Sequence, residues 1–465
     1  MSDPADLGVV DAAALLARRE LSSRELVEAC LARIRARDGV HSHDGDPASV
    51  NAWVRVYEED ALAAAARADE RLARGDAPPL CGVPVGLKDL FAVAGKPLTA
   101  SSRLLDEVPA RDSDVWARLS AAGMVLLGHL HTHEFAAGGT TDQVGNPWAL
   151  DRSAGGSSGG SAAALAAGMT PAATGTDTAG SLRIPSALCG TATLKPSRGL
   201  VSLRGVVPLG PTLDHAGPMA RTLADCAPLF AAMLGLPAPL PSTKRFSELR
   251  IAVSPRLGLV ELDPDVAAGY ERGLDACRRL GATLVEPPPP DAPLDAGADL
   301  GEVLLAELLP YHRRFDGRRD LYRPSLRAWV EAAEARASSA EEYVTLQARR
   351  AEETFAWSDW LAEQRLDALL EPTVPVVAPL RGSGYEDRFF DADLISLTRQ
   401  WNWTGFPVAA LPAGVGARSG LPVGVSLIGP PGRDFDVLAA GIELQAELPP
   451  TEAALVPPDN LPGPR

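Results

Sequence analysis

Apolar positions recur at helical spacing through the first part of the chain. The pattern covers residues 9–18 and the alanine-rich residues 60–74, and spacing of this kind is typical of amphipathic helices. Ser22, followed three residues later by Glu25, resembles a capping box that opens another helix through Cys30 and Ile34. We therefore predict a helical N-terminal segment over residues 1–75.

The pattern changes after residue 75. Short apolar runs such as residues 83–87 and 124–127 alternate with Gly/Pro turns and helical stretches. Residues 250–253, 265–280 and 283–286 form a further strand-helix-strand pattern. A strand-and-turn pattern returns over residues 366–372, 405–414 and 422–429. This alternation predicts an α/β fold around a central sheet. The predicted parts of this one domain are residues 76–235 and 366–447 for the core, 236–365 for a β-α-β unit with a helical cap, and 448–465 for a flexible tail.

Composition narrows the class of protein. The 465 residues are 46% hydrophobic and 22% charged, as in a globular enzyme with a sizeable core. A net charge of −16 argues against a nucleic-acid partner, although a local basic patch stays open. The five cysteines are scattered without CxxC spacing, which favours reduced thiols. The acidic N-terminus lacks signal-peptide features, and no apolar run has the roughly 18–20 residues of a membrane span. We expect a cytoplasmic protein without a membrane partner.

Residues 155–159 formally match the G-x-S-x-G pattern of the nucleophile elbow in α/β-hydrolases. That elbow needs a strand immediately before it and a histidine well downstream. We interpret residues 146–152 as no strand, and only His215 and His312 follow. The same block lacks the Gly-Lys-Ser/Thr ending of a phosphate-binding loop. We set both interpretations aside.

Three histidines, His129, His131 and His133, follow a predicted strand. A strand ending in His-x-His begins the site of many metal-dependent amidohydrolases, but such sites need further histidines from later strands. Only two histidines remain downstream, and no carboxylate stands in a recognisable metal motif. We therefore predict neither a metal nor another cofactor.

Lys88 is one of only four lysines in a chain that otherwise uses arginine for positive charge, and it lies in the apolar residues 82–91. A buried lysine can lose its proton, whereas arginine keeps its own. A neutral lysine can act as a base if its pKa falls from about 10.4 to about 7.5, and full burial beside apolar groups can cause a change of that size. Spacing alone leaves open whether Lys88 is a base or an ordinary core residue.

Two Gly/Ser-rich segments, residues 155–161 and 175–186, follow Lys88. Together with residues 82–89 they resemble the motifs of the amidase signature family, in the same order and spacing. The similarity is close over residues 20–235 and weaker over 366–445. It implies one large α/β domain with a central mixed, twisted sheet covered by helices on both faces. It also implies hydrolysis of linear amides without a cofactor.

The resemblance assigns roles residue by residue. Ser181 is the expected nucleophile, Ser157 the bridging serine on a cis peptide after Gly156, and Lys88 the base. The N–H groups of residues 178–181 are expected to form the oxyanion hole. The oxyanion and substrate-binding set is therefore Thr178, Ala179, Gly180 and Glu134, and the residues expected to orient this loop are Ser158, Asp177 and Arg183. Small polar residues at 157–161 also suit a helix N-terminus, and the two roles are compatible.

One position departs from the family, which usually has glycine where this chain has Ala179. If that residue needs positive φ, alanine strains the loop by about 1 kcal/mol. If it does not, the methyl group narrows the pocket. By analogy with the family, residues 134–141 and 297–365 face the acyl group. The arginines of the second segment are candidates for binding a carboxylate, although an exposed charged helix is the favoured explanation for Arg313, Arg314, Arg318 and Arg319.

Three functions follow from these observations. The leading hypothesis is an amidase that hydrolyses a small-molecule carboxamide through an acyl-enzyme on Ser181. The alternative is a glutamine-hydrolysing A-type subunit of a tRNA-dependent amidotransferase, which residues 146–148 and 155–164 also resemble and which requires partner subunits. The third, a binding protein on an inactive scaffold, is disfavoured because Lys88, Ser157 and Ser181 are all present. The oligomeric state stays open, with a homodimer as one option.

Overall fold

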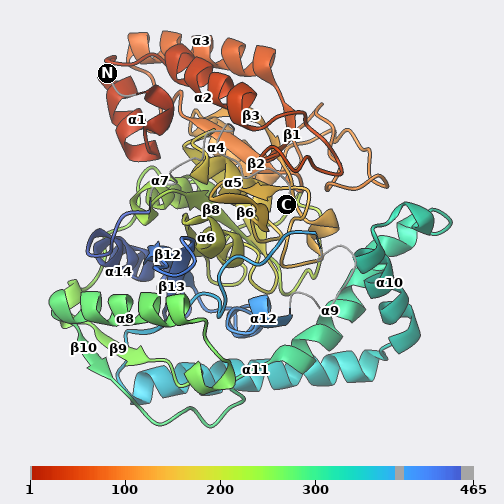
Figure 1. Ribbon diagram of the computed structural model, residues 1–465, viewed down its shortest axis with the longest axis vertical. Coiled ribbons are helices and arrows are strands. Elements are labelled where there is room, and N and C mark those ends of the chain that lie inside the picture. The colour runs from red at the N-terminus through yellow and green to blue at the C-terminus, as the bar shows by residue number, and fades with distance from the viewer. Residues whose placement is uncertain (1–2, 383–391, 452–465) are drawn as a thin grey trace.

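The computed structural model describes residues 3–382 and 392–451 and is built around one 11-stranded sheet (Figure 1). The order of the strands is β1-β3-β2-β6-β8-β7-β12-β13-β11-β9-β10. Their bounds are β1 Trp53–Val56, β2 Pro84–Lys88, β3 Val125–Leu130, β6 Ala172–Asp177, β7 Ala192–Lys195, β8 His215–Ala220, β9 Arg250–Val253, β10 Thr283–Val285, β11 Ala368–Pro372, β12 Val408–Val415 and β13 Pro422–Ile428.

The sheet is mixed, as the resemblance implied. Strand β2 is parallel to both of its neighbours, β3 and β6. Strands β8, β7, β12 and β13 then continue the sheet in antiparallel pairs, and β11, β9 and β10 are parallel to one another. The parallel β2–β6 pair matters most for function, because the carboxyl ends of parallel strands meet at one edge.

The helices of the described residues lie around this sheet. Their bounds are α1 Val9–Ala17, α2 Ser23–Arg37, α3 Glu58–Arg74, α4 Asp114–Ala121, α5 Gly159–Ala166, α6 Arg183–Cys189, α7 Leu223–Leu234, α8 Pro264–Arg279, α9 Gly297–His312, α10 Pro324–Arg336, α11 Ala340–Glu363, α12 Ala392–Ile395, α13 Gln400–Trp403 and α14 Asp434–Ala446.

Two neighbouring residues of β13 show that helices cover both faces of the sheet. Gly424 lies against Ala187 of α6, whereas Val425 lies against Gly273 of α8. Successive residues of a strand point to opposite faces, so α6 and α8 lie on opposite sides. Both expectations, an α/β fold and a sheet covered on two faces, are confirmed.

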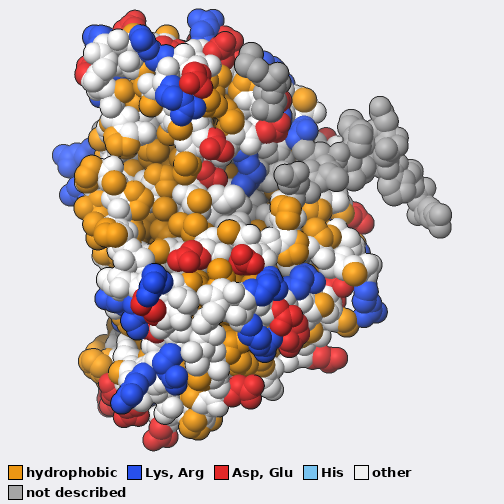
Figure 2. Space-filling model, turned by 90° about the vertical axis from the view of Figure 1, so that its left-hand side faces the viewer, with side chains coloured by type: hydrophobic (Ala, Val, Ile, Leu, Met, Phe, Trp, Pro, Cys, Tyr) orange, Lys and Arg blue, Asp and Glu red, His pale blue; other side chains and the backbone are white. Residues whose placement is uncertain are grey.

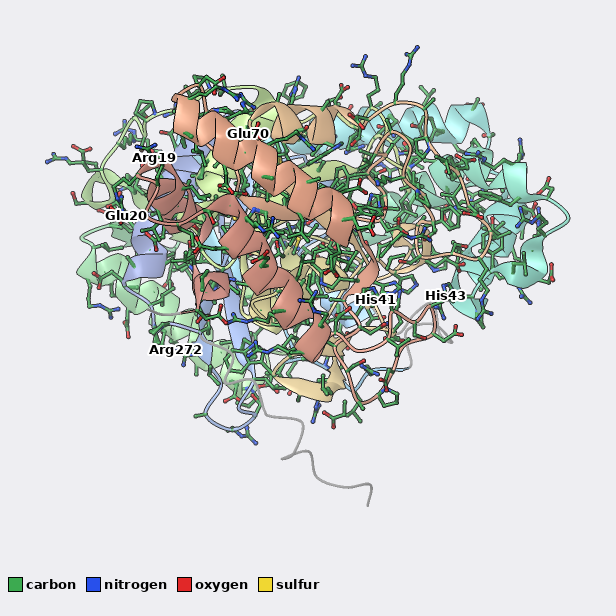
Figure 3. All side chains as sticks on the ribbon, turned by 90° about the horizontal axis from the view of Figure 1, so that it is seen from above. Arg19, Glu20, His41, His43, Glu70 and Arg272 are labelled. Atoms are coloured by element: carbon green, nitrogen blue, oxygen red, sulfur yellow. The ribbon has the colours of Figure 1, made fainter. Side chains whose placement is uncertain are left out.

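The N-terminal helices behave as their sequence predicts. The side chain of Ser22 accepts from the N–H of Glu25 at 3.1 Å, and the Glu25 carboxylate accepts from the N–H of Ser22 at 2.9 Å, which completes the capping box of α2. Helix α3 ends at Gly75 in the left-handed conformation. Helices α2 and α3 pack together across the top of the molecule (Figure 3).

Helices α9, α10 and α11, which we call the cap, extend along one side of the molecule (Figure 1). An apolar cluster joins them to the core. At its centre Phe135 packs against the rings of Tyr311, His312 and Phe315, with centroid distances of 6.1, 4.9 and 5.5 Å. The three helices lie within residues 236–365, where a helical cap was predicted. The cap contacts the loop that begins at Glu134.

Two sequence predictions need correction. The first 75 residues are not entirely helical, because β1 adds an edge strand antiparallel to β3. Strand β1 has only four residues, of which only Trp53 is fully buried, and strong helical patterns flank it. An alternation of apolar and polar residues over so few positions cannot be recognised in the sequence. The prediction that residues 146–152 form no strand is also wrong. Strands β4 (Gly145–Asn146) and β5 (Ala149–Ser153) form a two-stranded sheet of their own. This hairpin lies outside the central sheet, so it does not supply the strand of a nucleophile elbow.

The surface carries charges of both signs. On the face in Figure 2, basic and acidic side chains are intermixed beside a broad apolar area. Among the described residues, no helix is both long and apolar enough to cross a membrane. Most of the tail predicted for residues 448–465 lies outside the described residues.

Candidate active site

The candidate site lies at the carboxyl edge of the parallel strands β2 and β6. Lys88 is the last residue of β2, and Thr176 lies one residue before the end of β6. The Gly/Ser block leads into α5 at the same edge, and the segment after β6 leads into α6. Residues from two distant motifs therefore meet at Lys88.

The side-chain nitrogen of Lys88 contacts three hydroxyl groups. Its Nζ lies 2.7 Å from Ser157 Oγ, 2.9 Å from Ser158 Oγ and 2.8 Å from Thr176 Oγ1. Lys88, Ser157 and Ser158 have no exposed surface. The prediction that Lys88 and Ser157 lie together is thus matched by a direct hydrogen bond.

Burial lowers the pKa of Lys88 well below its ordinary value of 10.5. The negative charges of Asp177 and Asp214 oppose this change, but desolvation is the larger effect. None of the three hydroxyl partners carries a charge that would keep the lysine protonated. The environment therefore favours the neutral amine, which is the form that can accept a proton.

Ser181 lies in the loop between β6 and α6. Its carbonyl accepts from the N–H of Ser158 at 3.3 Å, which brings this loop against the Gly/Ser block. Ser181 is 7% exposed, in contrast to the fully enclosed Lys88 and Ser157. The peptide between Gly156 and Ser157 is cis, as the resemblance implied. A Cβ on Gly156 would lie 2.0 Å from Thr140 O, so only glycine fits there.

The loop before α6 offers unused hydrogen-bond donors. Within the described parts of the chain, the N–H groups of Ala179, Gly180 and Ser181 donate to no protein acceptor, whereas the next N–H, of Leu182, donates to Asp177 Oδ2 at 3.1 Å. Buried backbone N–H groups are nearly always paired. Several adjacent free donors beside a serine hydroxyl are what an oxyanion hole requires.

A buried ion pair supports this loop from below. Arg183 Nε and Nη2 each donate to one carboxylate oxygen of Asp177, both at 2.9 Å. Asn402 Nδ2 donates to Asp177 Oδ1 at 2.7 Å and to its carbonyl at 2.9 Å. Burial would raise the pKa of Asp177, but the Arg183 charge and these hydrogen bonds outweigh it and hold the pKa well below its ordinary value. The buried Asp177–Arg183 ion pair thus holds the loop in place.

Thr178 begins the loop and is attached to a second carboxylate. Its hydroxyl donates to Asp214 Oδ1 at 2.5 Å, and the N–H groups of Leu209 and Gly210 donate to the same side chain. Burial raises the pKa of Asp214 to about 6, although these bonds oppose the rise. Asp214 is therefore a third residue that orients the loop, in addition to the predicted Asp177 and Arg183.

Ala179 does not strain the loop. It is absent from the residues with positive φ, whereas its neighbour Gly180 has φ +146°. The first of the two alternatives for Ala179 is therefore wrong. Its half-buried methyl group packs against the apolar cluster between the core and the cap, so any effect is on the space beside the loop.

Glu134 lies under the cap and is fully buried. Its carboxylate accepts from Ser102 Oγ at 2.6 Å and from the N–H of Arg323, at the start of α10, at 2.8 Å. Arg323 also donates to the carbonyl of His43, which Figure 3 shows on the loop after α2. These contacts attach the cap to the core. A role of Glu134 in substrate binding stays a prediction.

Two of the four arginines between α9 and α10 are paired with acidic neighbours. Arg319 bonds with Asp316 at 2.7 Å and also pairs with Glu334, and Arg314 pairs with Glu107. Arg313 and Arg318 are exposed. The four arginines lie in the connection between α9 and α10, which has only two short 3-10 turns, so the predicted charged helix is wrong, although the position on the surface is as expected.

His129 of β3 and the two histidines that follow this strand, His131 and His133, are buried and bond to separate partners. His129 contacts the Tyr57 hydroxyl at 2.8 Å, His131 contacts Ser101 Oγ at 3.1 Å, and His133 contacts the carbonyl of Thr140 at 2.9 Å. In the described residues, no group of three His, Cys, Asp or Glu is placed to hold a metal ion.

Sequence reasoning missed several residues that complete the site. Thr176 belongs to the Gly/Ser-rich segment 175–186, and alternation along β6 could have placed it on the same face as Thr174, whose hydroxyl accepts from the N–H of Lys88. Asn402 and Thr398 lie more than 200 positions from the loop they contact. Only the weaker similarity over residues 366–445 hinted that this part of the chain approaches the site.

Comparison with known proteins agrees with this arrangement. A family model described as Amidase matches residues 25–438. The A subunit of the glutamyl-tRNA(Gln) amidotransferase of Anaeromyxobacter dehalogenans (strain 2CP-C) is 36% identical over 500 positions, which cover 97% of this chain and 99% of that protein. The protein of the same name from Roseiflexus castenholzii is 37% identical and covers 92% and 93%.

A solved structure shares the whole fold. A crystal structure of an amidase superposes with a TM-score of 0.84 at 31% identity, covering 95% of this chain and 100% of that one. The family model and these full-length similarities agree with one another. The chain therefore belongs to the amidase family, a family of enzymes that hydrolyse carbon–nitrogen bonds.

Proposed function

We propose that this chain hydrolyses a carboxamide through an acyl-enzyme on Ser181, with Ser157 and Lys88 as the proton relay. The observation that carries the proposal is the fully buried Lys88 Nζ, 2.7 Å from Ser157 Oγ and shifted toward its neutral form. A buried neutral amine beside a serine is a base without a counter-ion, and this is the arrangement that can activate a second serine.

The cycle needs no group beyond the chain, the amide and water. Neutral Lys88 takes a proton from Ser157 as Ser157 takes one from Ser181, whose Oγ attacks the carbonyl carbon. The free N–H groups of residues 179–181 stabilise the oxyanion. The proton then passes back to the leaving nitrogen, the C–N bond breaks, and ammonia or an amine departs. Water attacks the acyl-enzyme by the same relay and releases the carboxylic acid and Ser181.

Labelling with a fluorophosphonate tests the nucleophile. Ser181→Ala should lose both labelling and amide hydrolysis. Ser161→Ala is the matched control, because Ser161 lies in the same block but donates its hydroxyl to Thr174 O at 2.8 Å, and it should keep both. A label retained by Ser181→Ala would overturn the assignment.

A second candidate function uses the same chemistry, but in a complex with partner subunits. Both amidotransferase relatives described above are named as the A component of a glutamyl-tRNA(Gln) amidotransferase and match almost the full chain. These names support a glutamine-hydrolysing component, working with partner subunits and tRNA, more strongly than they support a stand-alone amidase. The stand-alone function is supported by the solved amidase that this chain covers completely.

Ammonia release by the purified chain separates the two candidates. Turnover of aliphatic or aromatic amides by the chain alone, with little preference for glutamine, would support the stand-alone amidase. Glutamine hydrolysis that rises when the chain is co-purified with partner subunits and charged tRNA would support the amidotransferase function. Cell fractionation during the same preparation tests the cytoplasmic location.

A further inference from the structure

Thr398 reaches the loop of free N–H groups from the far end of the chain. Its hydroxyl donates to the carbonyl of Ala179 at 2.5 Å. Its own carbonyl accepts from Arg183 Nη1 at 2.8 Å. A Cβ on Gly180 would lie 2.4 Å from Thr398 Oγ1, so the two residues are in direct contact. Thr398 is 1% exposed and takes no part in the proton relay.

The carbonyl that Thr398 binds determines where an N–H group points. Ala179 O and the Gly180 N–H belong to one planar peptide unit, in which a trans bond directs them to opposite sides. The cis bond of this structure is elsewhere, at Gly156–Ser157. A hydrogen bond on Ala179 O therefore fixes the plane and directs the Gly180 N–H away from Thr398. Glycine at φ +146° has no side chain to restrict this plane.

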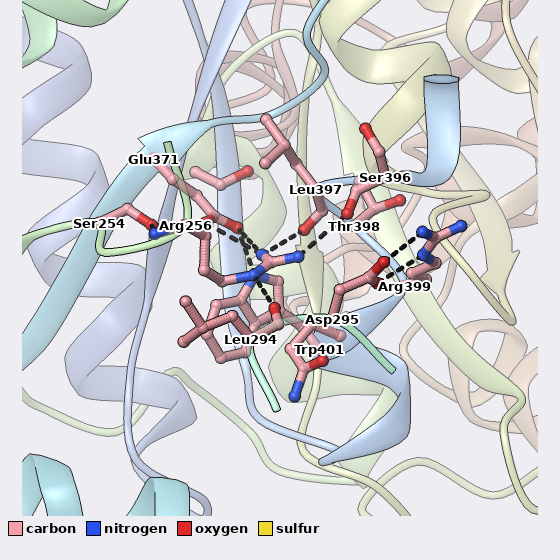
Figure 4. Close-up of polar contacts among 12 residues, drawn as sticks. Ser254, Arg256, Leu294, Asp295, Glu371, Ser396, Leu397, Thr398, Arg399 and Trp401 are labelled. Carbon is pink, nitrogen blue, oxygen red and sulfur yellow. Dashed lines mark hydrogen bonds and ion pairs between the residues drawn. The ribbon is translucent and has the colours of Figure 1, made fainter. Parts of the chain in front are cut away.

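Thr398 is in turn fixed by a second buried ion pair, shown in Figure 4. Arg256 donates to Leu397 O at 2.8 Å and to Ser396 O at 3.0 Å. The same guanidinium binds both carboxylate oxygens of Glu371, at 3.0 and 3.1 Å, and the carbonyl of Leu294 at 2.7 Å. Arg256 and Glu371 are 0% and 1% exposed. The residues before Thr398 thus have little freedom.

Asp295 connects this network to the cap. Its carboxylate accepts from Arg399 Nε at 2.7 Å and from the N–H of Gly297, the first residue of α9, at 3.1 Å. The segment 396–399 therefore lies between the cap and the loop before α6.

We propose that Thr398 is a positioning residue, which directs the Gly180 N–H toward the oxyanion by binding the carbonyl of Ala179. The assignment rests on the proposed function, because it gives a task to the same loop. Arg256 and Glu371 act one step further away by holding the carbonyls of Ser396 and Leu397. Thr398 itself touches neither substrate nor the reacting atoms.

Thr398→Val tests the proposal, since it removes the hydroxyl and keeps the shape. We expect kcat for an amide that the wild type turns over to fall roughly 10- to 100-fold, less than the full loss of an oxyanion donor. KM should change less than about threefold, because ground-state binding is not altered. Thr398→Ser keeps the hydroxyl and should restore most of kcat. The pH midpoint of kcat/KM should not move, because Lys88 is untouched.

A matched control is Thr193→Val. Thr193 is a buried threonine of β7 that donates to Pro218 O at 2.8 Å, away from the loop. Wild-type kcat in Thr398→Val would overturn the proposal, and so would an equal loss in Thr398→Ser or in Thr193→Val. Ser181→Ala is assayed beside them. Activity retained by Ser181→Ala would overturn the proposed function and this inference together, whereas its loss with an unaffected Thr398→Val would overturn this inference alone.

Discussion

The proposed relay depends on the protonation state of one amine, that of Lys88. Lys88 is enclosed, and its amine bonds to the hydroxyls of Ser157, Ser158 and Thr176. Lysine differs here from arginine because it can give up its proton at accessible pH. The chemistry of the site is therefore set by uncharged partners immediately around this nitrogen.

The rate of hydrolysis should rise with pH as Lys88 loses its proton. Because burial lowers its pKa, the midpoint of kcat/KM should lie well below 10.5, with a plateau above it. Lys88→Arg, which stays protonated, should reduce kcat at least about 100-fold across the range. Lys96→Ala removes a partly exposed lysine paired with Asp60 and should leave the profile unchanged. A Lys88→Arg variant with a normal profile would refute the relay.

The Asp177–Arg183 pair should contribute to stability as well as to geometry. Asp177→Asn leaves the Arg183 charge buried without its ion partner, which we expect to cost about 3–5 kcal/mol in urea unfolding. Adding Arg183→Met should cost less than the sum of the two single changes. Since the folded-state pKa of Asp177 lies below 3.8, the contribution is present above that pH and is lost only as the pH falls further. Additive effects would contradict the coupling.

The sequence named candidate reacting residues but not their surroundings. Lys88, Ser157 and Ser181 follow from motifs, and the Lys88–Ser157 contact agrees with that prediction. Whether Ala179 needs positive φ could not be read from the chain, because φ depends on how Thr398 and Arg183 hold the peptide planes. Periodicity carries no information about a contact made across 200 residues.

At the level of elements, the cap is attached through polar contacts of all three helices and through two apolar clusters, one around Phe135 and one around Trp357. Its α10 begins where the Arg323 N–H donates to Glu134, and Phe135 fills the space between α9 and the core. The sequence indicated helices here because their periodicity is long. It did not indicate β1 or the β4–β5 hairpin, whose strands have two to five residues.

Glu134→Gln should loosen the start of α10. An amide offers one acceptor instead of two, so either the Ser102 hydroxyl or the Arg323 N–H loses its partner, at a cost of about 1–2 kcal/mol. Hydrogen exchange at residues 323–327 should then become roughly tenfold faster, while exchange in α8 stays unchanged. Unaltered exchange at α10 would show that the contacts of Glu134 do not hold the start of this helix.

Across the whole molecule, the site is assembled from both ends of the sequence. The loop before α6 binds Thr398 and Asn402, which lie 215 and 225 positions from their partners Arg183 and Asp177. The order of strands explains this, because β7 of the first core segment pairs with β12 of the second. The sequence predicted two core segments in one fold. It could not show that residues of the second segment hold the loop before α6, which belongs to the first.

Nascent chains arrested at increasing lengths should react with a fluorophosphonate only after residue 402 has left the ribosome. Shorter chains already contain Lys88, Ser157 and Ser181. They lack Asn402, which binds the Asp177–Arg183 pair, and Thr398, which binds the carbonyl of Ala179. A Ser181→Ala series gives the background. Strong labelling of chains that end before residue 396 would show that the loop acquires its geometry unaided.

The contact between Thr398 and the carbonyl of Ala179 also has a consequence for synthesis of the chain. Proteins emerge from the ribosome N-terminal end first, so the groups that do the chemistry appear long before the groups that hold them. Under the proposed function, we expect the chain to be inactive as long as it lacks residues 396–402. The position of Thr398 in the chain therefore leads us to expect reactivity only late in synthesis.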